Sequence, residues 1–178
     1  HTIFGGKITL INRMLYNISG ISKFHDFHFF NTFLKSTKLY YCNFYQGILP
    51  FADNSVDILY TSHTLEHLNG KNGKQVISEI YRILKDGGVC RISLPCLDKA
   101  MEFYKKGDFN RLLRFFYADN DESFHSHRYA YNKEILSVIL KKVGFKEVKN
   151  SSYQSDDFPD SKFLDNRESE SFFINAIK

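Results

Sequence analysis

The amino-acid sequence predicts an α/β fold, with a doubly wound, mostly parallel sheet and one antiparallel strand near the carboxyl end. The first observation is a strand–helix–strand unit. Residues 56–61 (VDILYT) read as a buried strand, residues 73–85 as an amphipathic helix, and residues 89–94 (VCRISL) as a second strand. Such a unit implies parallel strands joined by a right-handed crossover. The second observation is that the strands expected at 145–153 and 171–177 have no helix between them, so they should pair antiparallel.

The other elements follow in chain order from hydrophobic periodicity and from residues that start or stop helices. Residues 8–19 place apolar side chains at helical spacing, and residues 38–42 (KLYYC) favour a strand. Residues 97–120 have a helical pattern rich in aromatic side chains. Residues 132–143 predict a helix that starts with an asparagine and is followed by a glycine. Residues 154–170 are polar, and we expect them to form a surface loop.

Length and composition indicate one domain over residues 1–178, with a helical insertion or lid at about residues 97–127. Hydrophobic residues make up 43% and charged residues 25% of the chain, which excludes wholesale disorder. The net charge of +4 is mild, so we do not expect a nucleic-acid partner. The three cysteines include no CxxC pair, which favours free thiols in a reducing compartment, and we expect a cytoplasmic protein.

The sequence contains no run of about 18 apolar residues, so we expect no membrane-spanning helix. Its first residues show no basic leader followed by an apolar stretch, so we also expect no signal peptide at this end. A homodimer is compatible with the sequence.

Three segments carry a family resemblance. They are Leu49–Asp57 (LPFADNSVD), Ser62–Leu68 (SHTLEHL) and Glu79–Gly88 (EIYRILKDGG). In their order and spacing they resemble class I S-adenosylmethionine-dependent methyltransferases. The resemblance is to the small methyltransferase-domain type 11-like proteins, which are often associated with cell-surface polysaccharide genes. The segment His127–Tyr131 adds to this resemblance, which covers roughly residues 38–178.

The resemblance implies a Rossmann-like fold and S-adenosylmethionine as the cofactor, bound where the carboxyl ends of parallel strands meet. Gly5 and Gly6 would form the turn that approaches the cofactor. Asp26, 20 residues after Gly6, would bind the ribose hydroxyls, and Asn43 would accept from the adenine amino group. The cofactor-binding residues that the resemblance implies are Gly5, Gly6, Asp26, Asn43, Phe44, Leu49, Ser62 and His63.

The amino-terminal segment departs from the family pattern. The family's first motif is an acid followed by glycines in alternation, whereas Thr2–Lys7 offers two adjacent glycines and no acid. Two functions therefore stay open. The first is methyl transfer from S-adenosylmethionine to an oxygen or nitrogen of a small-molecule or glycan acceptor. The second is a catalytically inactive protein of the same fold that binds or scaffolds a partner.

Histidines supply the candidate catalytic groups. His63 and His127 are the expected general bases for a hydroxyl acceptor, because imidazole titrates near neutral pH. The residues expected to bind the acceptor are His67, His125, Arg128 and Tyr129. Among these, Arg128 suits a carboxylate or phosphate of the acceptor. We expect no metal at His63, Glu66 and His67, because His63 stands where some relatives have a carboxylate and magnesium prefers oxygen ligands.

Overall fold

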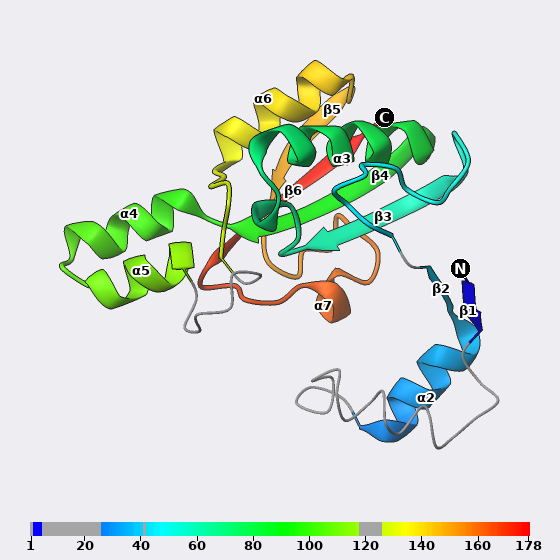
Figure 1. The fold of residues 1–178 in the computed structure, drawn as a ribbon, viewed down its shortest axis with the longest axis horizontal. Helices are drawn as coiled ribbons and strands as arrows, with labels where there is room; N and C mark the ends of the chain where they lie inside the picture. Colours follow the sequence, from blue (N-terminus) through cyan, green and yellow to red (C-terminus); the bar gives the residue numbers. More distant parts are fainter. Residues whose placement is uncertain (1, 5–25, 41, 118–125) are drawn as a thin grey trace. The chain divides into compact units, whose positions relative to one another are not determined.

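The computed structural model describes residues 2–4, 26–40, 42–117 and 126–178 (Figure 1). The chain forms two compact units, residues 1–42 and residues 43–178, and each has its own sheet. The strands of the described residues are β1 (Thr2–Phe4), β2 (Lys38–Tyr40), β3 (Val56–Ser62), β4 (Leu84–Pro95), β5 (Glu147–Ser151) and β6 (Ser171–Ile177). The helical segments are α2 (Phe27–Ser36), η2 (Leu65–His67), α3 (Gly70–Ile83), α4 (Leu97–Lys105), α5 (Phe109–Tyr117), α6 (Lys133–Val143) and α7 (Ser161–Leu164).

In the first unit, the described residues form an antiparallel pair of strands and helix α2. β1 pairs with β2, which confirms residues 38–40 of the strand expected at residues 38–42. Helix α2 begins at Asp26, whose carboxylate accepts a hydrogen bond of 2.8 Å from the N–H of Phe29. An acid at this position satisfies one of the free N–H groups of the first turn. The helix expected at residues 8–19 lies outside the described residues.

The sheet of the second unit confirms the predicted architecture. Its strand order is β3-β4-β6-β5. β3 and β4 run parallel, as the strand–helix–strand unit requires, whereas β6 runs antiparallel to both β4 and β5. β6 is therefore the single reversed strand of this sheet, and it is the strand that ends the chain (Figure 1).

Helices α3 and α6 cover one face of this sheet (Figure 1). α3 starts earlier than the sequence predicts because the side chain of Asn69 accepts from the N–H groups of Lys71 and Asn72. α6 has the predicted ends, with Asn132 as N-cap and Gly144 as C-cap at φ 125°. A positive φ of this kind favours glycine, which explains why the helix ends there.

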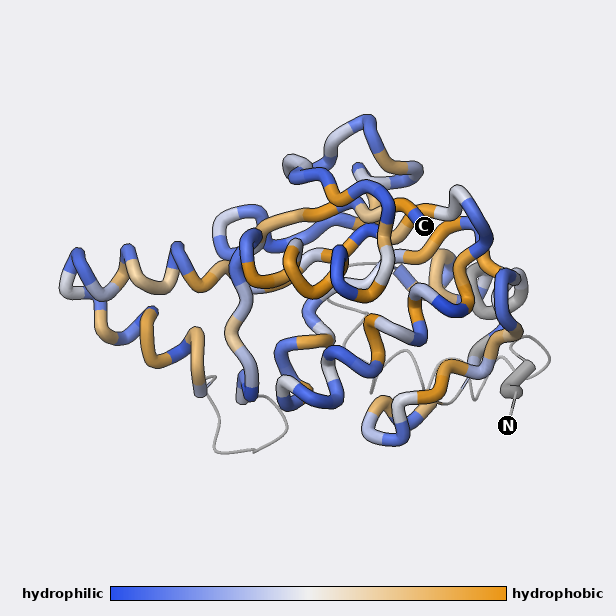
Figure 2. Tube along the Cα trace, turned by 90° about the horizontal axis from the view of Figure 1, so that it is seen from above, coloured by the Kyte–Doolittle hydropathy of each residue, from blue (hydrophilic) through white to orange (hydrophobic). Residues whose placement is uncertain are grey.

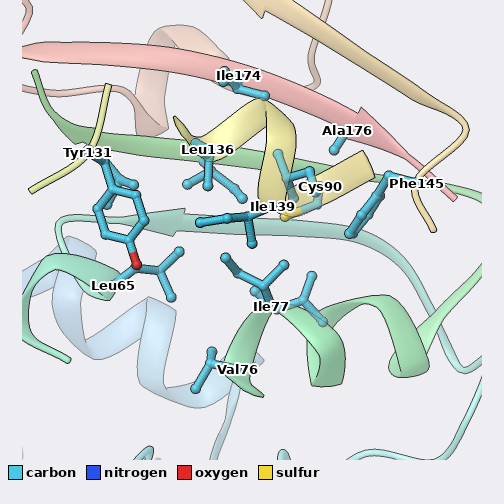
Figure 3. Packing of buried hydrophobic residues seen from close by; sticks show 14 of the residues in the cluster. Leu65, Val76, Ile77, Cys90, Tyr131, Leu136, Ile139, Phe145, Ile174 and Ala176 are labelled. Atoms are coloured by element: carbon cyan, nitrogen blue, oxygen red, sulfur yellow. The ribbon is translucent and has the colours of Figure 1, made fainter. Parts of the chain in front are cut away.

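The core lies between these two helices and the sheet. Cys90 and Ile92 on β4 point toward the helices, as do Ile174 and Ala176 on β6, and all four are buried. Figure 3 shows Ile77 of α3 and Leu136 and Ile139 of α6 in the same core as the strand residues Cys90, Ile174 and Ala176. Burial of the thiol raises the pKa of Cys90, so this cysteine behaves as a small hydrophobic residue.

The opposite face of β4 is polar, because neighbouring residues of a strand point to opposite faces. Arg91 lies between Cys90 and Ile92 and is fully buried there. Its partner Asp165 belongs to residues 154–170, which the sequence predicts as a surface loop. That prediction is wrong in part, since this segment includes α7 and buries Phe158 and Asp165. A charged partner on the sheet draws the segment inward.

Helices α4 and α5 follow β4 and pack against each other. They divide the single helical stretch expected at residues 97–120, because Gly107 adopts φ 73° between them. Figure 2 shows hydrophobic and polar residues alternating along both helices. None of the helices within the described ranges is long and apolar enough to cross a lipid bilayer.

Candidate functional site

A pocket of about 380 Å³ lies where β3 and β4 end. Parallel strands bring polar residues that follow them to the same edge of a sheet. α4 and α5, which follow β4 directly, contribute further wall residues. The pocket is lined by His63, His67, Pro95, Cys96, Lys99, Phe103, Arg111, Arg114, Phe115, His127, Arg167 and Glu170. The two predicted catalytic residues, His63 and His127, therefore lie in one pocket.

His63 directly follows β3 and is held from both ring nitrogens. Its Nε2 lies 2.8 Å from Oγ of Ser171, and its Nδ1 lies 3.3 Å from Oε1 of Glu66. Its backbone has φ 48°, a left-handed conformation that is uncommon for a residue with a side chain. The N–H of His63 donates to the carbonyl of Ser93 on β4, which fixes this turn against the sheet. The ring is thus positioned rather than free to rotate.

Glu66 lies in η2 and is 1% exposed. Its backbone carbonyl accepts from the N–H groups of Arg128 and Tyr129, at 2.7 and 3.1 Å. These bonds tie residues 126–129 to η2, so that His127 comes to lie beside His67. The two imidazole rings meet edge to face, with centroids 5.3 Å apart.

His127 is half-buried and its pKa lies below the ordinary histidine value. Burial is the main cause, since it disfavours the charged imidazolium, and the neighbouring His67 and His63 act in the same direction. The Glu66 carboxylate opposes this effect in part. A neutral His127 has a nitrogen lone pair available, so it can accept a proton or bind a metal.

Basic side chains surround the pocket. Lys99 donates to the carbonyls of Glu168 and Ser171, at 2.8 and 3.1 Å. Arg111 lies over the ring of Phe103, at 5.5 Å, and pairs with Asp108 at 3.4 Å. Such a lining favours an anionic group in the pocket.

The sequence prediction missed three of the lining residues, Lys99, Arg167 and Glu170. Arg167 and Glu170 belong to the polar segment that the sequence predicts as a surface loop.

Two predicted acceptor-binding residues point elsewhere, and a third cannot be placed. The guanidinium of Arg128 lies 5.8 Å from the ring centre of Tyr45, and Arg128 is not among the lining residues. Tyr129 packs on Tyr131, with ring centroids 4.8 Å apart. His125 lies outside the described residues, whereas His67 lines the pocket.

The residues that were predicted to bind the cofactor lie in both units. Gly5 and Gly6 lie outside the described residues, and Asp26 caps α2 in the first unit. In the second unit, Asn43 accepts from the N–H of Tyr45 at 3.0 Å, and Phe44 packs against the core. Ser62 ends β3 and donates to Asn166 at 3.5 Å. Among these positions, Ser62 and the neighbouring His63 are at the strand edge where a cofactor of this kind binds.

Leu49 has a structural role that the sequence did not reveal. Its N–H donates to Glu79 at 3.0 Å, and its carbonyl accepts from Arg82 at 3.2 Å. Arg82 also pairs with Asp53 and with Glu79 itself. These contacts join the first and third segments that carry the family resemblance. Their residues connect the loop before β3 to helix α3, away from the pocket.

The sequence model of the family described as "Methyltransferase domain" matches residues 27–92. The chain is 30% identical over 109 residues to a ubiquinone/menaquinone biosynthesis C-methyltransferase of Hydrogenovibrio crunogenus, covering 54% of this chain and 41% of that protein. A protein of the same description from Haemophilus ducreyi is 29% identical over 109 residues, with 56% and 41% covered. The chain thus spans about two fifths of the length of these curated relatives.

Solved structures give the same fold. An S-adenosylmethionine-dependent methyltransferase from Archaeoglobus fulgidus is 19% identical with a TM-score of 0.50, covering 78% of this chain and 66% of that one. One from Aquifex aeolicus is 15% identical with a TM-score of 0.50, covering 91% and 61%. The resemblance and the Rossmann-like fold predicted from the sequence are thereby confirmed.

Proposed function

We propose that this chain, which has the fold of class I S-adenosylmethionine-dependent methyltransferases, transfers a methyl group to an oxygen or nitrogen of an anionic small-molecule or sugar acceptor. The observation that carries the proposal is the position of His63. His63 directly follows a parallel strand and lines a pocket of about 380 Å³. Basic side chains surround that pocket. This combination provides both a base and a counter-charge for an acidic acceptor.

His63 is the proposed general base. Ser171 and Glu66 hold the ring from its two nitrogens, at 2.8 and 3.3 Å, so its direction toward the pocket is fixed before the acceptor binds. When bound, S-adenosylmethionine supplies a methyl group that is already activated by the positive sulfonium. The protein then needs only to position the acceptor and to remove a proton from a hydroxyl. His127, on the other side of Glu66, is the second candidate for that proton transfer.

Helices α4 and α5 are the proposed acceptor-side wall, and they would belong to the lid that the sequence predicts at about residues 97–127. Arg111 and Phe103 belong to these helices and line the pocket. A sugar ring can stack on Phe103, while Arg111 binds a carboxylate or phosphate. We further propose that the protein acts in the cytoplasm, in the assembly of cell-surface polysaccharides. We also propose a homodimer, which native mass spectrometry would test.

Calorimetry with S-adenosylhomocysteine tests the cofactor half of the proposal. The full chain should bind this product. Asp26→Asn should weaken the binding of S-adenosylhomocysteine by about tenfold or more, because the carboxylate that would bind the ribose hydroxyls by charge-assisted hydrogen bonds is lost. Asparagine is as good an N-cap as aspartate, so this variant keeps α2 intact. Asp57→Asn, on the exposed side of β3, is the control and should bind as the wild type does.

The second candidate function is that of an inactive binding protein. It is favoured by the two adjacent glycines in place of the family's first motif, and by the start of the family match at residue 27. This candidate predicts no transfer of labelled methyl groups to a metabolite extract. Detectable transfer by the full chain would reject it.

A further inference from the structure

Glu66 is a buried charge without a hydrogen-bonding partner. The residue is 1% exposed, and neither carboxylate oxygen accepts a hydrogen bond from any of the described residues. The nearest basic atoms are Nδ1 of His63 at 3.3 Å and Nε2 of His67 at 3.8 Å. A buried carboxylate is costly unless a positive charge or hydrogen bonds compensate it. Three histidines lie around this carboxylate, and within the described part of the chain no lysine or arginine side chain forms an ion pair with it.

The ring nitrogens of two histidines are set up to act as ligands. Nδ1 of His67 lies 3.3 Å from the carbonyl oxygen of Ser126, and a carbonyl can only accept, so this nitrogen carries the hydrogen. The lone pair of His67 is therefore on Nε2, the nitrogen that faces Glu66. Nδ1 of His127 is buried and has no hydrogen bond to the described residues. A hydrogen bond from the other nitrogen to a backbone carbonyl is the usual way in which a metal-binding histidine is oriented.

The ligand atoms converge. One oxygen of Glu66 and one nitrogen each of His67 and His127 lie within 4.8 Å of one another. Ligand atoms on opposite sides of a metal ion are roughly 4 Å apart when each bond is about 2.1 Å long. Small side-chain rotations would therefore bring all three atoms to bonding distance. His67 and His127 also line the pocket, so a bound ion would face it.

We propose that Glu66, His67 and His127 bind a divalent transition-metal ion such as Zn²⁺, Co²⁺ or Mn²⁺. Two imidazole nitrogens and one carboxylate suit these ions, whereas magnesium and calcium prefer sites made of oxygen ligands. Three protein ligands leave coordination positions open toward the pocket, where an acceptor oxygen can bind. His63, which contacts Glu66 but is not one of the converging ligands, orients the carboxylate. The proposal does not depend on methyl transfer, because the ion alone is the ligand to be measured.

The competing explanation is that a protonated His63 compensates Glu66 without any metal. The two explanations differ in what the Glu66→Gln substitution does. Under both explanations, Glu66→Gln removes a buried carboxylate from the metal-free protein. Only the metal site predicts that the wild type gains stability on adding Zn²⁺ or Mn²⁺ while Glu66→Gln gains none.

The experiment is a titration of the chelator-treated full chain with Co²⁺, followed by visible absorption, and with Zn²⁺, followed by calorimetry. We expect one ion per chain and a metal-dependent rise in the melting temperature. Glu66→Gln and His67→Asn should each weaken binding by about tenfold or more. His28→Ala, which removes an exposed histidine from α2, should bind as the wild type does.

Circular dichroism checks the fold of each variant before titration. Should His67→Asn unfold, Glu66→Gln decides the matter alone, because it keeps the size of the side chain. Absence of binding by the wild type would overturn the proposal. Equal binding by the wild type and a folded Glu66→Gln or His67→Asn variant would do the same. Saturation by Mg²⁺ in place of the transition metals would contradict the assigned ligand chemistry.

Discussion

Arg91 and Asp165 form a two-point ion pair on the polar face of the sheet. Nε of Arg91 lies 2.8 Å from Oδ1 of Asp165, and Nη2 lies 2.6 Å from Oδ2. Both side chains are 0% exposed. Arg91 also donates to Asn175 on β6 and to Ser151 on β5, at 2.9 and 2.8 Å. The pair therefore joins the segment between β5 and β6 to the strand that ends at the pocket.

Removing Asp165 should be strongly destabilising. Asp165→Ala removes the buried partner of Arg91 and leaves only Asp157, at 3.7 Å and partly exposed, as a counter-charge among the described residues. Breaking one side of a buried pair costs about 3–5 kcal/mol. Urea unfolding should show this loss as a lower midpoint. Asp57→Ala is the matched control, because its pair with Lys85 is exposed and such pairs contribute less than about 1 kcal/mol. Equal losses in the two variants would contradict the assigned role of the buried pair.

Gly73 and Tyr131 should be energetically coupled. A Cβ added to Gly73 would lie 2.6 Å from the hydroxyl of Tyr131, which has no hydrogen-bonding partner among the described residues. Figure 3 shows the ring of Tyr131 with its hydroxyl directed toward Leu65, inside the core. Gly73→Ala should therefore cost about 1–3 kcal/mol through overpacking, although alanine is the better helix former. Tyr131→Phe should be neutral or stabilising, since it removes a buried unpaired hydroxyl.

The double variant tests this coupling. In a Tyr131→Phe background, Gly73→Ala should be less costly, with a coupling free energy of about 0.5–3 kcal/mol. Chemical denaturation of the four proteins gives the value directly. Additive effects of the two substitutions would show that the hydroxyl is not what limits the space beside Gly73.

The strands of the sheet could be predicted because the spacing of hydrophobic residues and the residues that end helices are local features of the sequence. Residues 56–61 and 171–177 read as strands from their own composition, and each has the predicted direction in the structure. Helix α6 likewise begins and ends at the residues that cap it. Arg91 could not be placed in this way. Its alternation with Cys90 and Ile92 shows that it points to the other face, but only the tertiary structure reveals that Asp165 meets it there.

The proximity of His63 and His67 could be predicted, because both follow β3 and polar residues after parallel strands lie at the same edge of a sheet. His127 follows no strand, and it reaches them through the backbone hydrogen bonds of the next two residues to Glu66. Arg128 was predicted beside them, yet its backbone binds Glu66 and its side chain turns to Tyr45. The position of Glu170 in the pocket wall could not be predicted, because residues 154–170 show no regular hydrophobic pattern. Long-range contacts of this kind leave no trace in local sequence pattern.

Glu79 should make stability depend on acidity. Its hydrogen bonds from Arg82, helped by the N–H of Leu49, hold its pKa below the ordinary value of 4.5, although partial burial acts in the opposite direction. A carboxyl with a lowered folded-state pKa contributes stability above its unfolded-state pKa and loses it as the pH falls through the folded value. The wild type should thus lose part of its unfolding free energy below about pH 4.5.

Glu79→Gln is the variant that isolates this effect. It should be less stable than the wild type at neutral pH, and the difference should shrink as the pH falls below 4.5. Urea unfolding across this range measures it. Asp57→Asn serves as the control, because its carboxylate is 72% exposed and its pair with Lys85 is screened by solvent. A constant difference between Glu79→Gln and the wild type at all pH values would count against the Arg82 contact as the cause.

Substituting His63 should separate proton removal from acceptor binding. The measurement is the initial rate of label transfer from methyl-labelled S-adenosylmethionine to a metabolite extract. His63→Gln should lower this rate by about 10²–10⁴-fold, the usual contribution of a general base. Ser171→Ala removes only the 2.8 Å contact that orients the ring, so its loss should be smaller. His28→Ala should behave as the wild type does. A wild-type rate in folded His63→Gln would assign the proton transfer to another group, with His127 across Glu66 the next to substitute.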